Sequence, residues 1–259
     1  MKIIVCVKQV LDTASEIKVD ENQVFSPGSP KIINPYDEFA IEEAVRIKEN
    51  KPDSEITLLS LGPETFKDSI KKGLAMGADK AIHLKDEKFE GLDSYALAKV
   101  LAGFIKKSSY DLVLCGRQAV DLDRAQTGPA LATFLNIPFV TMVTRLDFSE
   151  DFSKAKIKRQ VEGGNEIREL SLPFLATCQK GLNEPRLPSL KGIMAAKKKE
   201  VLVFSADDLS EENLDLGENR VIEENLSLPP KRKKGIILEG TNEEVGKNLV
   251  ELLQEAKII

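Results

Sequence analysis

The segment 116–128 (GRQAVDLDRAQTG) carries the residue types and spacing best suited to holding an anion. It follows an apolar run and enters a helical pattern, and the first backbone N–H groups of a helix have no partner within the helix. Gln126, Thr127 and Gly128 stand at that point, where the helix dipole favours negative charge and a glycine allows close approach. The pattern indicates a phosphate-binding turn.

Arg117 and Arg124 in the same segment could offset the charge of a phosphate. An ordinary polar turn between a strand and a helix, with Asp123 as the helix N-cap, explains the same residues. Neither GxGxxG nor GxxxxGK followed by Ser or Thr occurs in the chain, which argues against a Rossmann dinucleotide site and a Walker-type nucleotide hydrolase. A phosphate site of another design and a plain turn both remain open.

The tetrapeptide 34–37 (NPYD) opens another helical pattern. Asp37 can cap that helix, and Pro35 fixes the entry of the chain. His83, the only histidine, lies in the apolar run 80–84, where we expect it to be packed rather than to act as a base in a cleft. No Ser-His-Asp or Cys-His arrangement is apparent, so we expect no catalytic residues.

The three cysteines, Cys6, Cys115 and Cys178, are too few for the disulfide framework of a secreted protein. Their spacing fits no metal site, so none is predicted. Cys6 and Cys115 lie in or beside apolar runs and are expected to be buried, inert thiols.

The charge and hydropathy patterns restrict the function classes further. The chain has 37 basic and 42 acidic residues, which argues against a general nucleic-acid-binding protein. No apolar run approaches the roughly 20 residues that span a bilayer, so membrane insertion is not expected. The N-terminus is typical of the first strand of a cytosolic protein, and we expect a cytoplasmic location.

Short apolar runs alternate with amphipathic patterns through the first 145 residues or so, which indicates parallel strands joined by helices. The predicted fold class is α/β, with an open, mostly parallel sheet covered by helices on both faces. Ligands bind such sheets at the carboxyl ends of the strands, so the loops after Val7, Leu61 and Cys115 should converge. The expected strands are 3–7, 56–61, 80–84 and 111–115, and the expected helices are 37–48, 65–76, 93–107 and 125–135.

The pattern changes after about residue 145. Alternating polar runs over 145–172 predict an antiparallel hairpin or edge addition to the sheet. The run 174–177 predicts one more strand, and 178–200 is loop-rich. We expect residues 1–204 to form the α/β domain. Residues 205–259, with the basic run KRKK at 231–234, should form an extended arm that ends in an amphipathic helix at 243–257 and packs on a partner. The apolar face of that helix would consist of Val245, Leu249, Leu252 and Leu253.

The segment 182–194 combines prolines with several large apolar side chains, an unusual composition for a loop. A docking surface for a partner explains this composition, and so does a small core beneath the loop. The apolar residues concerned are Leu187, Leu190, Ile193 and Met194.

Five blocks, in one order along nearly the whole chain, resemble the beta subunits of electron transfer flavoproteins. They are VKQVLD (7–12), NPYDEFAIEEA (34–44), LAMGADKAIH (74–83), DLVLCGRQAVDLDRAQTG (111–128) and LNEPRLPSLKGIMAAKKK (182–199). The resemblance implies an electron carrier subunit rather than an enzyme. It also implies a heterodimer with a larger alpha subunit, which holds the redox-active FAD.

The same resemblance implies the electron partners: flavin dehydrogenases such as acyl-CoA dehydrogenases as donors, and a quinone oxidoreductase or another protein as acceptor. It implies an adenine nucleotide in this subunit, which is AMP in ordinary members and a second FAD in electron-bifurcating ones. The segment 125–129 (AQTGP) is similar to the bifurcating pattern, whereas 182–186 (LNEPR) is similar to ordinary members. A stand-alone nucleotide-binding regulatory module is a further alternative.

The resemblance also carries the family's site residues onto this chain, position by position. The loop 182–199 corresponds to the family's recognition loop, and Leu190 to the leucine that anchors in a dehydrogenase pocket. The implied nucleotide site consists of Cys6, Asn34, Pro35, Tyr36, Asp37, Leu61, Gly116, Arg117, Gln118, Ala119, Val120, Asp121, Leu122, Asp123, Arg124, Ala125, Gln126 and Thr127.

Overall fold

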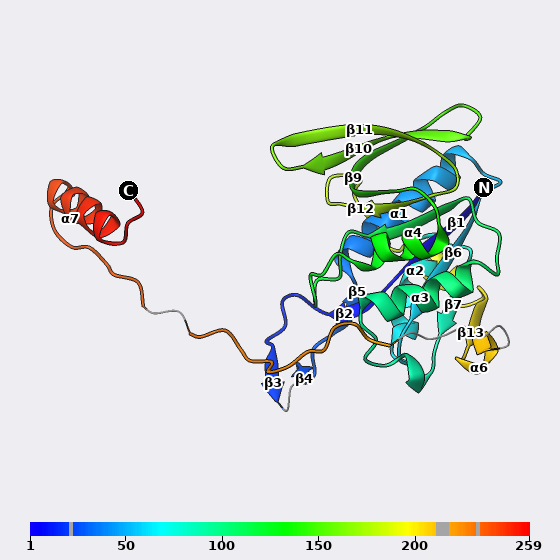
Figure 1. Ribbon diagram of the computed structural model, residues 1–259, viewed down its shortest axis with the longest axis horizontal. Helices are drawn as coiled ribbons and strands as arrows, with labels where there is room; N and C mark the ends of the chain where they lie inside the picture. Colours follow the sequence, from blue (N-terminus) through cyan, green and yellow to red (C-terminus); the bar gives the residue numbers. More distant parts are fainter. Residues whose placement is uncertain (21–22, 211–217, 232–233) are drawn as a thin grey trace.

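A nine-stranded sheet forms the centre of the computed structural model, which describes residues 1–20, 23–210, 218–231 and 234–259 (Figure 1). Its strand order is β11-β10-β9-β12-β8-β1-β6-β7-β13. The strands β9, β12, β8, β1, β6, β7 and β13 run parallel, and β10 and β11 add an antiparallel edge. The predicted fold class is therefore confirmed. The parallel strands are β1 (Lys2–Cys6), β6 (Glu55–Leu61), β7 (Lys80–Leu84), β8 (Leu112–Gly116), β9 (Phe139–Phe148), β12 (Phe174–Cys178) and β13 (Val201–Phe204).

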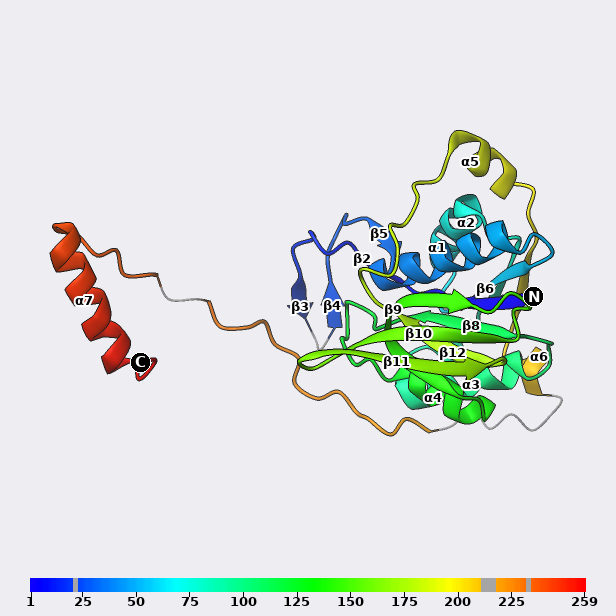
Figure 2. The ribbon, with the colours of Figure 1, turned by 90° about the horizontal axis from the view of Figure 1, so that it is seen from above.

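Helices cover both faces of this sheet (Figure 2). Successive residues of β1 point to opposite faces, as in any strand: Ile3 and Val5 pack against α1 and α2, whereas Ile4 packs with the cluster beneath α3 and α4. Two hydrophobic cores result, one on each face of the sheet. Together they hold the strands whose ends form the site. The helices are α1 (Pro35–Asn50), α2 (Phe66–Met76) and α5 (Leu190–Ala196) on one face, and α3 (Ser94–Ile105) and α4 (Thr127–Leu135) on the other.

Capping signals mark the ends of several helices. Asp93 is the N-cap of α3, and its side chain accepts a hydrogen bond from the backbone N–H of Ala96 at 2.8 Å. Gly77 is the C-cap of α2, with a φ of 142° that favours glycine. Pro35 occupies the first turn of α1, as expected from its fixed φ.

The predicted antiparallel addition over 145–172 is present as a meander of β9, β10 (Lys154–Val161) and β11 (Gly164–Ser171). The predicted strand at 174–177 is β12, which lies inside the sheet between β8 and β9. The loop-rich prediction for 178–200 is wrong at α5, a short helix whose N-cap Ser189 accepts from the backbone N–H of Gly192. Elements that the sequence analysis did not predict are β2 (Gln9–Leu11), β3 (Lys18–Asp20), β4 (Gln23–Phe25), β5 (Lys31–Ile33), β13, a 3₁₀ turn at Glu87–Phe89 and α6 (Asp207–Ser210).

The C-terminal segment leaves the body and ends in α7 (Asn242–Glu255), which stands apart from the sheet in both views (Figures 1 and 2). A capping box between Thr241 and Glu244 starts this helix, and none of its residues is buried. Of the predicted basic run at 231–234, the residues 232–233 lie outside the described part of the chain, as do 211–217 of the arm. No helix in the described part of the chain combines the length and the apolar character needed to cross a membrane.

Candidate functional site

A cavity of about 330 Å³ opens at the carboxyl ends of the central strands. Cys6, Leu61 and Gly116 line it from the ends of β1, β6 and β8, and Ser94 and Thr127 line it from the first residues of α3 and α4. Ligands bind at this edge in open α/β sheets, because loops and helix N-termini meet there. The loops predicted to converge do so around one space.

Most of the predicted nucleotide-site residues line this cavity. Those that do are Cys6, Asn34, Asp37, Leu61, Gly116, Arg117, Gln118, Ala119, Leu122, Arg124, Ala125, Gln126 and Thr127. Pro35, Tyr36, Val120, Asp121 and Asp123 belong to the same segments but do not line it.

The sequence analysis missed the opposite wall of the cavity, which the segment after β7 supplies. Its lining residues include Asp86, Phe89, Leu92 and Leu97. A usable signal was present, because the run 80–84 was predicted as a parallel strand and its carboxyl end had to meet the same edge.

Asn34 holds the cavity loop in place. Its side-chain amide donates to the carbonyl of Gln118 at 2.8 Å, and its side-chain oxygen accepts from the backbone N–H of Val120 at 3.1 Å. The residue is only 1% exposed, so these bonds satisfy polar atoms that water does not reach. Asn34 therefore fixes the loop that starts at Gly116 to the beginning of α1.

Asp37 joins three segments rather than capping α1, so its predicted capping role is wrong. The N-cap position is Asn34, and Asp37 lies inside the first turn. Its carboxyl group accepts from the backbone N–H of Lys8 at 2.8 Å, from that of Gly116 at 3.2 Å and from the side chain of Asn34 at 2.9 Å. Burial raises the pKa of Asp37 to about 7, against the opposing effect of these hydrogen bonds. Near neutral pH the cavity wall thus carries less negative charge than its composition suggests.

Gly116 is required by the close packing of β8 against α1. A Cβ atom at this position would overlap the Asp37 carboxyl oxygen and would lie 2.8 Å from the Asp37 backbone nitrogen. Because the second contact is with backbone, rotation of a side chain cannot relieve it. Any larger residue must displace the start of α1 or the cavity loop.

The loop from Arg117 to Gln126 is strained at two residues: Asp123 (φ 51°) and Ala125 (φ 53°) have left-handed backbones. The N-cap position of α4 is Gln126, so the alternative with Asp123 as N-cap is wrong. The side-chain amide of Gln118 instead donates to the Asp123 carboxylate at 2.5 Å. Gln126 and Thr127, at the start of α4, line the cavity, and the first N–H groups of a helix have no partner within the helix.

Cationic groups surround the same space. Arg117 lines the cavity, donates to Gln179 at 3.3 Å and lies 6.0 Å from the ring centroid of Tyr36. Arg124 also lines it and pairs with Glu223 of the C-terminal arm. Both arginines therefore border the cavity, and Arg124 already has a carboxylate partner there.

Residues 219–221 of the C-terminal arm contact the segment that leads into α3. The carboxylate of Asp93 accepts from the backbone N–H groups of Arg220 at 2.5 Å and of Val221 at 2.9 Å. The side-chain amide of Asn219 donates to the carbonyl of Gly91 at 2.8 Å. The N-cap of α3 therefore also holds the arm.

The remaining titratable candidates are packed side chains. His83 is 1% exposed, its Nε2 lies 2.9 Å from the carbonyl oxygen of Gly62, and burial lowers its pKa, so the packed interpretation is confirmed. Cys115 is buried as predicted, and interaction with the Cys6 thiol together with burial raises its pKa. Cys6 is only half-buried. No cluster of three or more metal-binding side chains occurs among the described residues.

The loop 182–199 exposes the apolar side chains that the sequence singled out. Leu187 is 88% exposed and Leu190 is 79% exposed, with Met194 at 56% and Ile193 at 45%. The alternative of a small core beneath the loop is therefore wrong for these four side chains. These four exposed apolar side chains are called here the docking loop surface.

Comparison with known proteins is decisive for the family. The family described as "Electron transfer flavoprotein domain" matches residues 24–209. The chain belongs to the electron transfer flavoprotein family. An electron transfer flavoprotein subunit beta from Thermoanaerobacterium thermosaccharolyticum is 43% identical over the full length of both chains. The corresponding protein of Bacillus subtilis is 39% identical over the full length of both.

A third relative has a more specific name. The caffeyl-CoA reductase-Etf complex subunit CarD of Acetobacterium woodii is 40% identical over the full length of both chains. The resemblance seen in the five sequence blocks is thus confirmed, and the chain is an electron transfer flavoprotein beta-type subunit with a role in electron transfer.

Proposed function

We propose that this chain is the beta subunit of a heterodimer whose alpha subunit holds the redox-active FAD, and that it binds AMP in the cavity described above. The observation that carries the proposal is the convergence of the family's nucleotide segments, at Asn34, Asp37 and Gly116–Thr127, on one cavity. The chain itself supplies binding and orientation. The flavin of the partner supplies the electron chemistry.

The cavity suits a mononucleotide. Its volume of about 330 Å³ lies at the lower end of the roughly 300–1,000 Å³ of small-molecule sites, which favours AMP over the larger FAD. The N-terminus of α4 and the guanidinium groups of Arg117 and Arg124 would hold the phosphate. Apolar residues on the opposite wall, among them Phe89 and Leu97, would contact the base.

The docking loop surface would engage the electron donor. We propose a flavin dehydrogenase, such as an acyl-CoA dehydrogenase, whose pocket accepts Leu190, and a quinone oxidoreductase or similar protein as acceptor. One apolar anchor on an exposed loop suits a transient complex, in which a few side chains supply most of the binding energy. The arm 205–259 would pack on the alpha subunit, because α7 has an apolar face and no buried residue. We place the complex in the cytoplasm, where free thiols such as those of this chain persist.

A second candidate is a bifurcating complex with FAD in the same cavity. The full-length similarity to a subunit of a caffeyl-CoA reductase complex favours it, together with AQTGP at 125–129. Acid extraction of the co-expressed heterodimer, followed by chromatography, separates the two. One FAD and one AMP per heterodimer are expected, whereas two FAD and no AMP would establish the second candidate. A colourless chain that purifies without an alpha subunit would contradict both and leave a stand-alone nucleotide-binding module.

A further inference from the structure

The docking loop surface places large apolar side chains in solvent, and contacts with the rest of the molecule hold the loop in that position. Exposed leucines on an unsupported loop tend to collapse onto the nearest apolar surface, yet Leu187 and Leu190 remain 88% and 79% exposed. The chain on either side of them must therefore be held. Polar contacts on both sides supply this support.

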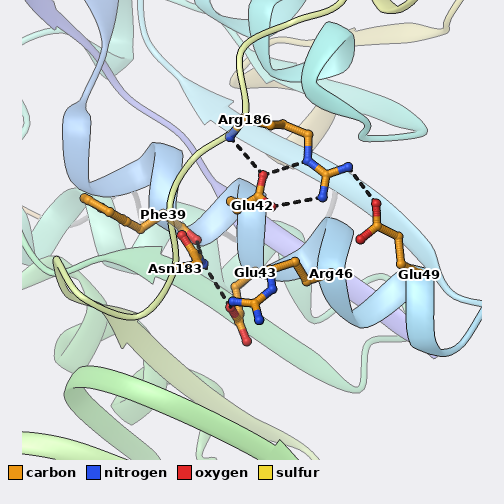
Figure 3. A network of polar contacts seen from close by, with 7 residues as sticks. All are labelled: Phe39, Glu42, Glu43, Arg46, Glu49, Asn183 and Arg186. Atoms are coloured by element: carbon orange, nitrogen blue, oxygen red, sulfur yellow. Dashed lines mark hydrogen bonds and ion pairs between the residues drawn. The ribbon is translucent and has the colours of Figure 1, made fainter.

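Arg186, one residue before Leu187, forms the first anchor (Figure 3). Its Nε donates to Oε2 of Glu42 at 2.8 Å, its Nη2 donates to Oε1 at 2.9 Å, and its backbone N–H donates to Oε2 at 3.1 Å. Its Nη1 donates to Glu49 at 2.6 Å. These two carboxylates raise the pKa of Arg186 above its ordinary value. The planar guanidinium is thus fixed in position and orientation on α1.

The carboxylate of Glu42 makes this anchor different from a surface ion pair. The residue is 4% exposed, and both of its oxygens accept from Arg186. A buried carboxylate that loses its partner is left poorly solvated, which makes loss of the contact costly. The contact therefore constrains the loop strongly, whereas exposed pairs such as Arg145–Asp147 contribute little.

Asn183 reinforces the first anchor. Its side-chain amide donates to the carbonyl of Phe39 at 3.0 Å and to Glu43 at 2.9 Å, both on α1 (Figure 3). Burial raises the pKa of Glu43. The hydrogen bond from Asn183 and the positive charge of Arg46 act in the opposite direction. Residues 183–186 thus contact α1 from Phe39 to Glu49, almost three turns, before the exposed leucines begin.

Lys199 forms the second anchor, at the other end of the loop. Its Nζ donates to the carbonyl of Leu74 at 2.9 Å and to that of Ala78 at 2.6 Å, at the C-terminal end of α2. A cation suits this position because the carbonyls at a helix end carry partial negative charge. Between the anchors, Gly192 packs directly on the carbonyl oxygen of Ala75.

We infer that Arg186 is a positioning residue for the docking step. Its hydrogen bonds to Glu42 and Glu49 hold the docking loop surface in the geometry that a donor flavoprotein recognises. This inference rests on the proposed docking function of the loop. When a segment adopts its binding-competent conformation only part of the time, the apparent Kd equals the intrinsic Kd divided by the competent fraction. Arg186 thus lowers the cost of docking without contacting the electron donor.

Amide hydrogen exchange of the intact heterodimer tests the anchor without any donor. In Arg186→Gln, we expect exchange of the amides 187–196 to accelerate by about tenfold, as the loop opens more often. Arg186→Lys should restore part of the protection, and Arg145→Gln is the matched control with wild-type exchange. If Arg186→Gln fails to fold, Glu49→Gln removes only the exposed partner and should give a smaller acceleration in the same segment. Wild-type exchange at 187–196 in the folded variants would overturn the inference.

Reduction of the heterodimer by an acyl-CoA dehydrogenase and its acyl-CoA substrate tests the consequence. Arg186→Gln should raise the KM for the heterodimer by about tenfold and leave kcat within about twofold, because only the competent fraction changes. Leu190→Ala, measured in parallel, separates the two proposals. A raised KM for Leu190→Ala with a wild-type KM for Arg186→Gln would overturn the inference alone. A wild-type KM for Leu190→Ala would remove the docking function, and the exchange experiment would still decide whether Arg186 holds the loop.

Discussion

The cavity, which we propose binds a nucleotide, and the docking loop use burial in opposite ways. In the cavity wall, the polar side chains of Asn34 and Asp37 are buried and hydrogen-bonded, so the space they border has a fixed shape. In the docking loop, the polar groups of Arg186 lie against α1 and the apolar side chains of Leu187 and Leu190 face solvent. The two regions share α1, whose first turn borders the cavity and whose later turns hold the loop. Satisfied polar contacts position both sites, and what differs is the kind of side chain left free to bind.

Gly116→Val is the substitution that we expect to disrupt the cavity most strongly while leaving the docking loop unchanged. The new side chain would overlap Asp37 and its backbone, so we expect loss of most bound nucleotide and a decrease of about 3 kcal/mol in the free energy of unfolding. Nucleotide extraction and urea denaturation measure the two effects. Gly164→Val is the matched control, since nothing lies within 4 Å of a Cβ atom there. Full nucleotide content in Gly116→Val would contradict the placement of the site.

The corresponding change in the docking loop is Leu190→Ala. We expect kcat/KM for reduction by the dehydrogenase to fall by about 30-fold, which corresponds to about 2 kcal/mol for a central anchor. Folding and nucleotide content should stay unchanged, because the side chain is 79% exposed. Ile167→Ala, at a side chain that is 62% exposed on β11, is the control and should retain wild-type kinetics. Equal losses in both variants would mean that the loop has no special role.

Asp37 gives the cavity wall a pH dependence that extends to neutral pH. Its pKa is raised in the folded state from 3.8 to about 7, so the folded protein holds a proton that the unfolded chain releases between these values. The contribution to stability is therefore complete below about pH 4 and is lost as the pH rises towards 7, with a slope of at most about 1.4 kcal/mol per pH unit. Urea denaturation from pH 5 to pH 8 should show a smaller decline for Asp37→Asn than for the wild type. Identical slopes would show that Asp37 is ionised throughout this range.

The smallest expected effect concerns the strained loop of the cavity. Ala125 has a φ of 53°, so Ala125→Gly should raise the free energy of unfolding by up to about 1 kcal/mol. Ala119→Gly in the same loop, at a residue without positive φ, should lower it by a similar amount. Thermal denaturation of the two variants measures the difference. Destabilisation in both would mean that the left-handed conformation of Ala125 carries no strain.

The alternation of parallel strands with helices, and the sheet edge at which the loops after β1, β6 and β8 meet, could be predicted from the sequence, because buried strands are continuously apolar and the amphipathic helices between them are long. Gly116 and Thr127 could be placed at that edge for the same reason. The resemblance to the family added residues that the apolar pattern alone does not select, such as Asn34.

Other features depend on contacts between distant segments, which local patterns do not encode. Asp37 looks like a helix cap in the sequence, but its partners are the backbone N–H groups of Lys8 and Gly116, which only the assembled sheet brings close. The short strand β13 pairs with β7 across more than a hundred residues, and α5 depends on packing against α2. The pairing of Arg186 with Glu42 likewise spans 144 positions.

A crystal structure of the co-purified heterodimer tests the central claim most directly. We expect an adenine nucleotide in the cavity, with a phosphate at the backbone N–H groups of residues 126–128 and within reach of Arg117 and Arg124, and the side chain of Leu190 free of both subunits. A cavity filled by protein side chains, with the nucleotide bound elsewhere or Leu190 covered by the alpha subunit, would contradict it.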